Sequence, residues 1–139
     1  MSAAFADFDV AALLARLGVA PRRITSDSRV VEPGVAFAAY PGARVDGRAF
    51  IGDAIARGAS AVLWEAAGWT WDPKHEVPHL PVEDLRGRLG PIADFICGSP
   101  SEALWMVGVT GTKGKALCSL WIAHAFAAVG GRGAVIGTL

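Results

Sequence analysis

Short apolar runs of strand length recur along the chain, separated by turns that contain glycine or proline. "VAFAAY" (Val35–Tyr40) and "SAVLWE" (Ser60–Glu65) are almost uninterrupted, which is typical of strands buried on both faces of a sheet. Polar residues and prolines bound the other runs. The expected strands lie within residues 22–31, 35–40, 60–65, 77–82, 103–110 and from 133 onward.

Between these runs, apolar residues recur at helical spacing. A helix over residues 10–17 places four apolar side chains on one face, with Asp7 or Asp9 as its N-cap and Gly18 as its stop. Further helices are expected over residues 48–58, over 83–98 with an interruption at Gly90–Pro91, and over 115–131. Strands that alternate with helices in this way predict parallel βαβ units and therefore an α/β fold.

The best boundary in the chain is "CGSPSE" (residues 97–102), which is small, polar and proline-bearing. It separates a complete α/β domain, residues 1–98, from a single β-loop-α-β unit, residues 99–139. One helix cannot cover both faces of a parallel sheet, so the second unit is not expected to close a core of its own.

Composition narrows the class of protein. Of 139 residues, 53% are hydrophobic and 19% charged, which excludes a disordered chain. Thirteen basic residues balance thirteen acidic ones, so no basic surface for nucleic acid is expected. The chain shows no signal-peptide pattern, and its apolar runs are shorter than the roughly 20 residues of a membrane span. Cys97 and Cys118 are interpreted as reduced, mostly buried thiols, and the predicted location is cytoplasmic with no membrane partner.

"VTGTKGKALCS" (residues 109–119) has the pattern of a phosphate-binding loop. Its glycines follow an expected strand, precede an expected helix and lead into Lys115, and two of the three lysines of the chain lie here. Backbone N–H groups and a lysine in this arrangement favour bound phosphate. Ala116 stands where a magnesium-binding hydroxyl is usual. The alternative is a glycine-rich turn with incidental lysines.

Two segments together resemble the Mur ligase family. Residues 107–139 resemble the start of its ATP-binding central domain, whose loop usually contains T-G-T-N-G-K-[ST]. Residues 24–63 resemble the uridine-nucleotide-binding N-terminal domain of the MurE branch, through "DSR", a following "PG", "AFAAYPG" and "DGRAFI" in order. The resemblance implies a small Rossmann-like UDP-binding domain over residues 1–98, followed by the first β-loop-α-β unit of a P-loop ATP-binding domain.

The resemblance also implies a reaction. Such ligases use ATP and Mg2+ to phosphorylate the terminal carboxylate of UDP-MurNAc-L-Ala-D-Glu, and diaminopimelate or lysine then attacks the acyl phosphate to form an amide. The step belongs to peptidoglycan synthesis. The chain ends before the acidic metal ligands, the carbamylated lysine and the C-terminal domain of the family. We therefore expect it to bind the UDP-sugar without catalysing ligation alone.

The resemblance assigns site residues by position. UDP-substrate contacts are expected from Ser26, Asp27, Ser28, Arg29, Ala43, Arg44, Val45, Asp46 and Gly47. ATP phosphate contacts are expected from Gly111, Thr112, Lys113, Gly114, Lys115, Ala116 and Leu117, with Lys115 also assigned a catalytic role. No metal ligand is assigned. Lys113 replaces the asparagine of the family and Ala116 its hydroxyl residue, so impaired Mg2+ ligation is expected.

Three alternatives remain open. Without the family, Asp27 and Arg29 form a surface turn with a local ion pair. The chain could be a non-catalytic α/β interaction module that self-associates through residues 103–139, whose apolar face needs a cover. A small P-loop phosphotransferase is disfavoured, because no room remains after the loop for a magnesium-binding acid and an acceptor site.

Overall fold

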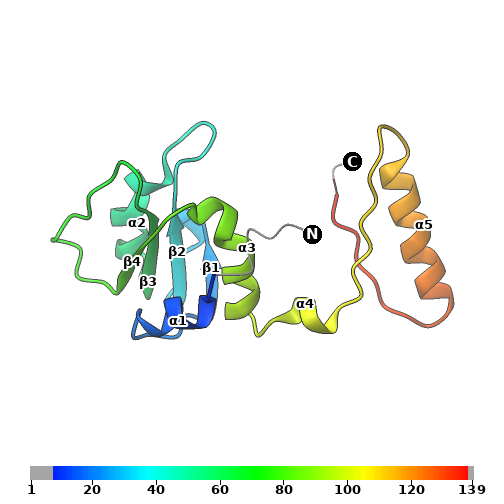
Figure 1. Ribbon diagram of the computed structural model, residues 1–139, viewed down its shortest axis with the longest axis horizontal. Helices are drawn as coiled ribbons and strands as arrows, with labels where there is room; N and C mark the ends of the chain where they lie inside the picture. The colour runs from blue at the N-terminus through cyan, green and yellow to red at the C-terminus, as the bar shows by residue number, and fades with distance from the viewer. Residues whose placement is uncertain (1–7, 138–139) are drawn as a thin grey trace. The chain divides into compact units, whose positions relative to one another are not determined.

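The computed structural model describes residues 8–137, so Asp7, one of the two expected caps, lies outside the described part. The chain divides into two compact units, one up to Ala103 and one from Leu104. The first contains the sheet and most of the helices, and the second contains one long helix (Figure 1).

The first unit is built on a four-stranded parallel sheet. The strands follow one another in the order β1-β2-β3-β4. Their bounds are β1 Arg23–Thr25, β2 Val35–Ala39, β3 Ala61–Glu65 and β4 His79–Val82. Because all four strands are parallel, their carboxyl ends lie along one edge of the sheet. The α/β prediction is confirmed for this unit.

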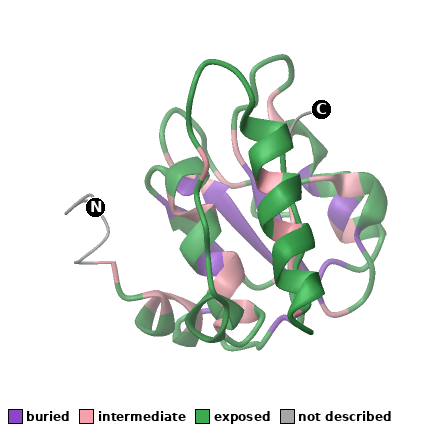
Figure 2. Ribbon diagram, turned by 90° about the vertical axis from the view of Figure 1, so that its right-hand side faces the viewer, coloured by how far each residue is buried: buried purple, intermediate pink, exposed green. Residues whose placement is uncertain are grey.

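Side chains of the two central strands alternate between two cores. Ala38 and Leu63 point to the face covered by α1 (Val10–Ala15) and α3 (Leu85–Ile96). Phe37 and Val62 point to the opposite face, which is covered by α2 (Ile51–Ala56) and part of the segment between β3 and β4. Buried residues therefore gather on the strands (Figure 2). Asp9 caps α1 as expected, because its carboxylate accepts a hydrogen bond from the Ala12 N–H at 2.9 Å.

The segment between β3 and β4 is irregular, as expected, and Trp71 packs it against the sheet. The Trp71 ring stacks on the imidazole of His79 with ring centroids 3.8 Å apart, and on Trp64 of β3 with centroids 5.9 Å apart. Together with α2, these contacts cover that face of the sheet.

Helix α3 passes through Pro91 without a break, so the expected interruption is wrong. Leu85 and Ile92 are buried on one face, and Leu89 and Ile96 pack beside them. Pro91 is exposed on the other side. The continuous apolar stripe against the sheet outweighs the backbone hydrogen bond that proline removes.

The second unit contains α5 (Lys115–Ala128) between two segments without regular structure, and the short α4 (Pro100–Ala103) precedes it. No strand forms within residues 104–137. The prediction of strands over 103–110 and from 133 onward is therefore wrong for these residues. A strand needs neighbouring strands to supply hydrogen bonds, and two short strands are marginal in water. As expected, this unit closes no core: α5 has no buried residue (Figure 2).

Exposed side chains at the end of α3 and along α5 also correct two interpretations. Cys118 is an exposed thiol, and so is Cys97 at the end of α3, so neither cysteine is buried. His124 of α5 is exposed as well and does not act in packing. Among the described residues, no helix combines the length and the apolar character that crossing a membrane requires.

Candidate functional site

The two loops predicted to contact the UDP-substrate leave neighbouring strands at the same edge of the sheet. Residues 26–29 follow the carboxyl end of β1, and residues 40–47 follow the carboxyl end of β2. Ligands of open α/β sheets bind outside the carboxyl ends of strands. The topology therefore brings the two sequence-predicted sets to one edge.

The first loop is a tight turn closed by Asp27 and Arg29. The Asp27 carboxylate accepts hydrogen bonds from the backbone N–H, Nε and Nη2 of Arg29 at 3.0, 2.9 and 2.7 Å. It thereby caps the 3₁₀ helix η2 (Ser28–Val30). The side-chain hydrogen bonds from Arg29 lower the pKa of Asp27 to about 2. The Arg29 side chain is 82% exposed, so its outer face remains open to an anionic ligand.

The second loop is an exposed turn with a closed base. The Gly42 N–H donates to the Val45 carbonyl at 2.9 Å, and the Gly47 N–H donates to the Tyr40 carbonyl at 3.0 Å. Ala43, Arg44 and Val45 are exposed at the tip. Backbone groups at the tip are therefore available to a ligand, in line with the predicted role of this stretch.

At the base of the second loop, Asp46 binds a buried arginine that the sequence did not single out. The Asp46 carboxylate accepts from the backbone N–H, Nε and Nη2 of Arg48 at 3.0, 3.0 and 2.8 Å and caps the 3₁₀ helix η3 (Gly47–Phe50). The Arg48 side chain is 9% exposed, and its Nη1 donates to the Ala67 carbonyl at 2.6 Å and the Glu65 carbonyl at 3.3 Å. Side-chain hydrogen bonds from Arg48 lower the pKa of Asp46. A sequence signal for Arg48 does exist: the Asp-x-Arg pattern of Asp27 and Arg29 occurs again at Asp46 and Arg48.

A hollow of about 460 Å³ opens beside the first loop. Ser28 and Arg29 line it together with Phe50, Asp53 and Arg57, which come from η3, from α2 and from the residue that ends α2. No sequence pattern distinguishes these three residues from an ordinary helix surface. The surface beside the first loop that could contact a ligand therefore continues along α2.

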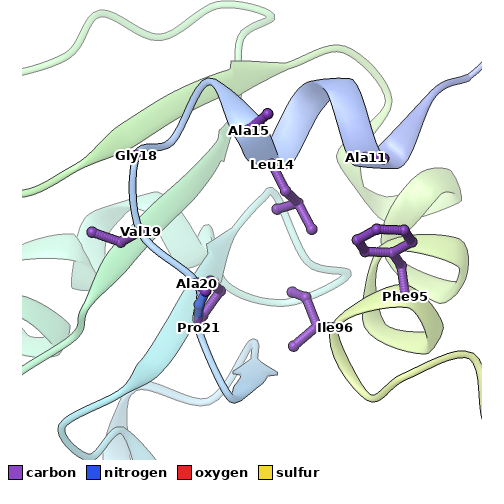
Figure 3. Close-up of a pocket in the computed structure, with 9 residues that line it drawn as sticks. All are labelled: Ala11, Leu14, Ala15, Gly18, Val19, Ala20, Pro21, Phe95 and Ile96. Atoms are coloured by element: carbon purple, nitrogen blue, oxygen red, sulfur yellow. The ribbon is translucent and has the colours of Figure 1, made fainter.

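A second hollow, of about 470 Å³, is apolar and lies elsewhere (Figure 3). Leu14 of α1 and Phe95 and Ile96 at the end of α3 line it, with the residues that enter β1. That entry is at the amino end of the strand, so this hollow lies at the sheet edge opposite to the predicted UDP contacts. Sequence reasoning assigned no role to it.

The glycine loop leads directly into α5. Gly114 takes the N-cap position with φ 78°, and no side chain caps the helix there. The Lys115 ammonium donates to the Gly111 carbonyl at 2.6 Å, so the lysine lies back across the loop. All seven predicted ATP contacts, residues 111–117, are exposed. Uncapped N–H groups beside an ammonium fit a phosphate group.

The same loop does not fit magnesium in the expected way. Ala116 carries a methyl group where a hydroxyl would be needed, and the Ser119 hydroxyl donates to the Ala116 carbonyl at 2.9 Å. No three His, Cys, Asp or Glu side chains within residues 8–137 are placed to hold a metal ion together. Position 116 therefore offers no side-chain ligand to the ion that normally accompanies ATP.

Comparison with known proteins gives three findings. A model of the Mur ligase family, catalytic domain, matches residues 22–96. The UDP-N-acetylmuramoyl-L-alanyl-D-glutamate--2,6-diaminopimelate ligase of Nitrosomonas europaea is 49% identical over 129 residues, 93% of this chain and 25% of that protein. The enzyme of the same name from Chromobacterium violaceum is 46% identical over 137 residues, 98% of this chain and 28% of that protein.

A solved structure is similar as well. The crystal structure of MurF ligase from Thermotoga maritima in complex with ADP has a TM-score of 0.59 and 27% identity, and the match covers 77% of this chain and 23% of that one. The chain thus spans about a quarter of the length of the curated relatives it matches.

Proposed function

Since this chain belongs to the Mur ligase family, we propose that it supplies the UDP-substrate-binding part of an ATP-dependent amide ligase of peptidoglycan synthesis. The complete ligase would act in the cytoplasm and add the third residue, diaminopimelate or lysine, to UDP-N-acetylmuramoyl-L-alanyl-D-glutamate through an acyl phosphate. The similarity to two diaminopimelate ligases extends over almost the whole chain and supports this reaction.

One observation carries the proposal: the Ser26–Arg29 turn and the Ala43–Gly47 loop leave adjacent parallel strands at one edge. The exposed Arg29 guanidinium offers charge to the diphosphate, and the Ser28 hydroxyl and the backbone groups of the second loop offer hydrogen bonds to the uridine. These residues bind and orient the nucleotide handle of the substrate, while the chemistry takes place at the far end of the peptide. We therefore propose that residues 1–98 form a Rossmann-like domain that binds substrate and does not catalyse alone.

Calorimetry with UDP-N-acetylmuramoyl-L-alanyl-D-glutamate tests this proposal on the 139-residue chain. We expect saturable binding that UDP competes away and ADP does not. Ser28→Ala should weaken it, and Thr70→Ala, at an exposed position in the segment after β3, should leave it unchanged. A folded chain that binds no UDP-sugar would overturn the proposal.

We assign residues 99–139 to the start of the ATP-binding domain. In this assignment Gly111, Thr112, Lys113, Gly114, Lys115, Ala116 and Leu117 surround the ATP phosphates, and the Lys115 ammonium supplies positive charge to them. The uncapped start of α5 and the position of Lys115 across the loop support the assignment. Bound ATP would supply the phosphoryl group that activates the substrate carboxylate.

The methyl group of Ala116 leads to a separate test. ATP affinity of the chain should respond little to Mg2+, because position 116 offers no ligand. Ala116→Thr should make binding tighter with Mg2+ present and leave it unchanged without Mg2+, whereas Ala125→Thr, at an exposed position of the same helix, should change neither. Equal affinities of the unaltered chain and Ala116→Thr under both conditions would show that this side chain does not matter.

A self-associating interaction module is the second candidate function. The exposed apolar residues of the second unit, among them Trp105 and Trp121, are its motivation. The comparisons favour the ligase, because the relatives match residues on both sides of the predicted boundary. Light scattering distinguishes the two, since a monomer at high concentration excludes the module.

A further inference from the structure

We propose that Arg48 is a positioning residue for the UDP-sugar: it ties the base of the loop 41–47 to the chain leaving β3 and so holds the tip of the loop in its binding position. The inference rests on the proposed function, because that function makes Ala43–Val45 a ligand contact. Arg48 itself does not belong to the predicted contact set.

The burial of Arg48 is compensated almost entirely by hydrogen bonds. Its side chain is only 9% exposed, and its Nε and both terminal nitrogens donate to Asp46, to the Ala67 carbonyl and to the Glu65 carbonyl. The guanidinium also lies over the Trp69 ring, 5.0 Å from its centroid. A buried charge is tolerated only with such a complete set of partners, so the side chain has one favourable position.

The anchor to which Arg48 is attached is a fixed part of the sheet. Glu65 is the last residue of β3, and its carboxylate accepts hydrogen bonds from the backbone N–H groups of Asp84 and Leu85 at 3.2 and 2.7 Å, where α3 begins. The backbone carbonyl of the same residue accepts from Arg48. One guanidinium thus joins the loop after β2 to a point held by both β3 and α3.

The loop, in contrast, has few restraints of its own. Its backbone hydrogen bonds, from Gly42 to Val45, from Gly47 to Tyr40 and from Ala49 to Asp46, hold its shape but all lie within residues 40–49. Ala43 and Val45 are exposed. The orientation of the tip therefore depends on the base, and Asp46 is where the base is tied down. A lysine could not replace Arg48, because one ammonium cannot form the two-pronged contact with Asp46 while reaching the carbonyl of Ala67.

Two variants separate positioning from general stability. Asp46→Asn removes the charge at the loop and leaves the bonds from Arg48 to the two carbonyls, whereas Arg48→Lys cannot hold Asp46 and the carbonyls at the same time. Arg86→Lys, at an exposed position of α3, is the matched control. The measurements are the Kd for UDP-N-acetylmuramoyl-L-alanyl-D-glutamate by calorimetry and amide hydrogen exchange of the free chain.

Both variants should raise the Kd about tenfold, roughly the value of one charge-assisted hydrogen bond. Exchange at the Gly42 and Gly47 amides should become faster by a similar factor, about tenfold, while the amides of β3 keep their rates. If Arg48→Lys fails to fold, loop exchange in Asp46→Asn decides the question, because Asp46 is itself a predicted UDP contact and its Kd does not separate the two roles.

Unchanged loop exchange in folded variants would overturn the inference whatever the Kd, and so would exchange that accelerates equally in the loop and in β3. If the unaltered chain binds no UDP-sugar, the proposed function fails, and the ligand part of the inference fails with it. Loop exchange then still decides whether Arg48 orders the loop.

Discussion

Two turns of this protein share the pattern Asp-x-Arg and nearly identical local hydrogen bonds, yet their arginines have opposite surroundings. In both turns the aspartate caps a 3₁₀ helix and accepts from three nitrogens of the arginine two residues later, at distances that agree within 0.1 Å between the turns. The Arg29 side chain is 82% exposed and the Arg48 side chain 9%. The comparison shows that the local sequence determines the turn, whereas the neighbouring chain determines what the arginine does.

The difference arises from the chain after β3. Arg48 finds the carbonyls of Glu65 and Ala67 and the Trp69 ring above it, whereas among residues 8–137 the side chain of Arg29 forms hydrogen bonds only with Asp27. The same kind of turn is therefore a structural tie after β2 and an open, charged surface after β1.

The largest effect is expected from removing the buried arginine. Arg48→Ala should lower the free energy of unfolding by about 3 kcal/mol, the lower end of the range for breaking a buried ion pair, because Asp46 is partly exposed and can be hydrated. Urea denaturation at pH 7 measures this. Arg29→Ala should leave the urea midpoint unchanged, and equal losses in the two variants would refute the contrast.

The next largest effect on stability is expected at the middle residue of the second turn, Gly47. A Cβ added to Gly47 would lie 2.8 Å from the Tyr40 carbonyl oxygen, a backbone atom that cannot easily move. Gly47→Ala should therefore cost about 1–3 kcal/mol in unfolding free energy, the usual range for overpacking. The first turn has Ser28 at the equivalent position and tolerates a side chain.

Gly52→Ala is the control for that experiment. A Cβ at this position of α2 would meet only a side-chain atom of His75, at the ordinary distance of 3.7 Å. Alanine is the better helix former by up to about 1 kcal/mol, so the control should be neutral or stabilising. A Gly47→Ala variant as stable as Gly52→Ala would mean that the two turns do not differ in packing.

Acid sensitivity gives a smaller effect. The hydrogen bonds from Arg48 lower the pKa of Asp46 below its ordinary 3.8, so the unfolded chain takes up the proton first as pH falls. The contribution is complete above pH 3.8 and is lost as pH falls through the lower pKa of the folded state. Asp46→Asn should thus cost about 1 kcal/mol at pH 7, since one charged hydrogen-bond acceptor of a partly exposed pair is lost.

Urea titrations at a series of pH values from 7 to 2 measure this dependence. The difference between the unaltered chain and Asp46→Asn should close toward the acid end. Asp53→Asn serves as control, because the Asp53 carboxylate accepts no hydrogen bond within the described part of the chain. A difference that stays constant with pH would show that the ionised carboxylate is not what stabilises the second turn.

Much of the first unit was predictable from the sequence, because the signals were local. The apolar runs that became β2 and β3 and the polar turns after β1 and β2 were predicted close to their observed places. Pro91 shows where local signals fail. Proline in a helix usually predicts a break, but packing of α3 on the sheet keeps the helix continuous. The strand expected over 103–110 failed for the converse reason, since that segment finds no partner strand within the described chain.

The candidate site divides in the same way. Asp27, Ser28 and Arg29 form a turn that the residues themselves suggest, and the topology puts this turn beside the loop after β2. Arg48 could not be distinguished from Arg29 by sequence, because its burial depends on Glu65 and Ala67, which lie 17 and 19 residues further along.

The smallest expected effect on stability is the one that tests the open turn most directly. Arg29→Ala should leave the urea midpoint unchanged, because the guanidinium is largely hydrated and within residues 8–137 its hydrogen bonds go to Asp27 alone. It should nevertheless weaken binding of UDP-N-acetylmuramoyl-L-alanyl-D-glutamate by about tenfold, if the exposed face of Arg29 gives the diphosphate one charge-assisted hydrogen bond. Calorimetry at two salt concentrations measures this, since a charged contact between exposed groups weakens as salt rises. If Arg29→Ala has the affinity and salt dependence of the unaltered chain, Arg29 does not contact the diphosphate, and the first turn has only a structural role.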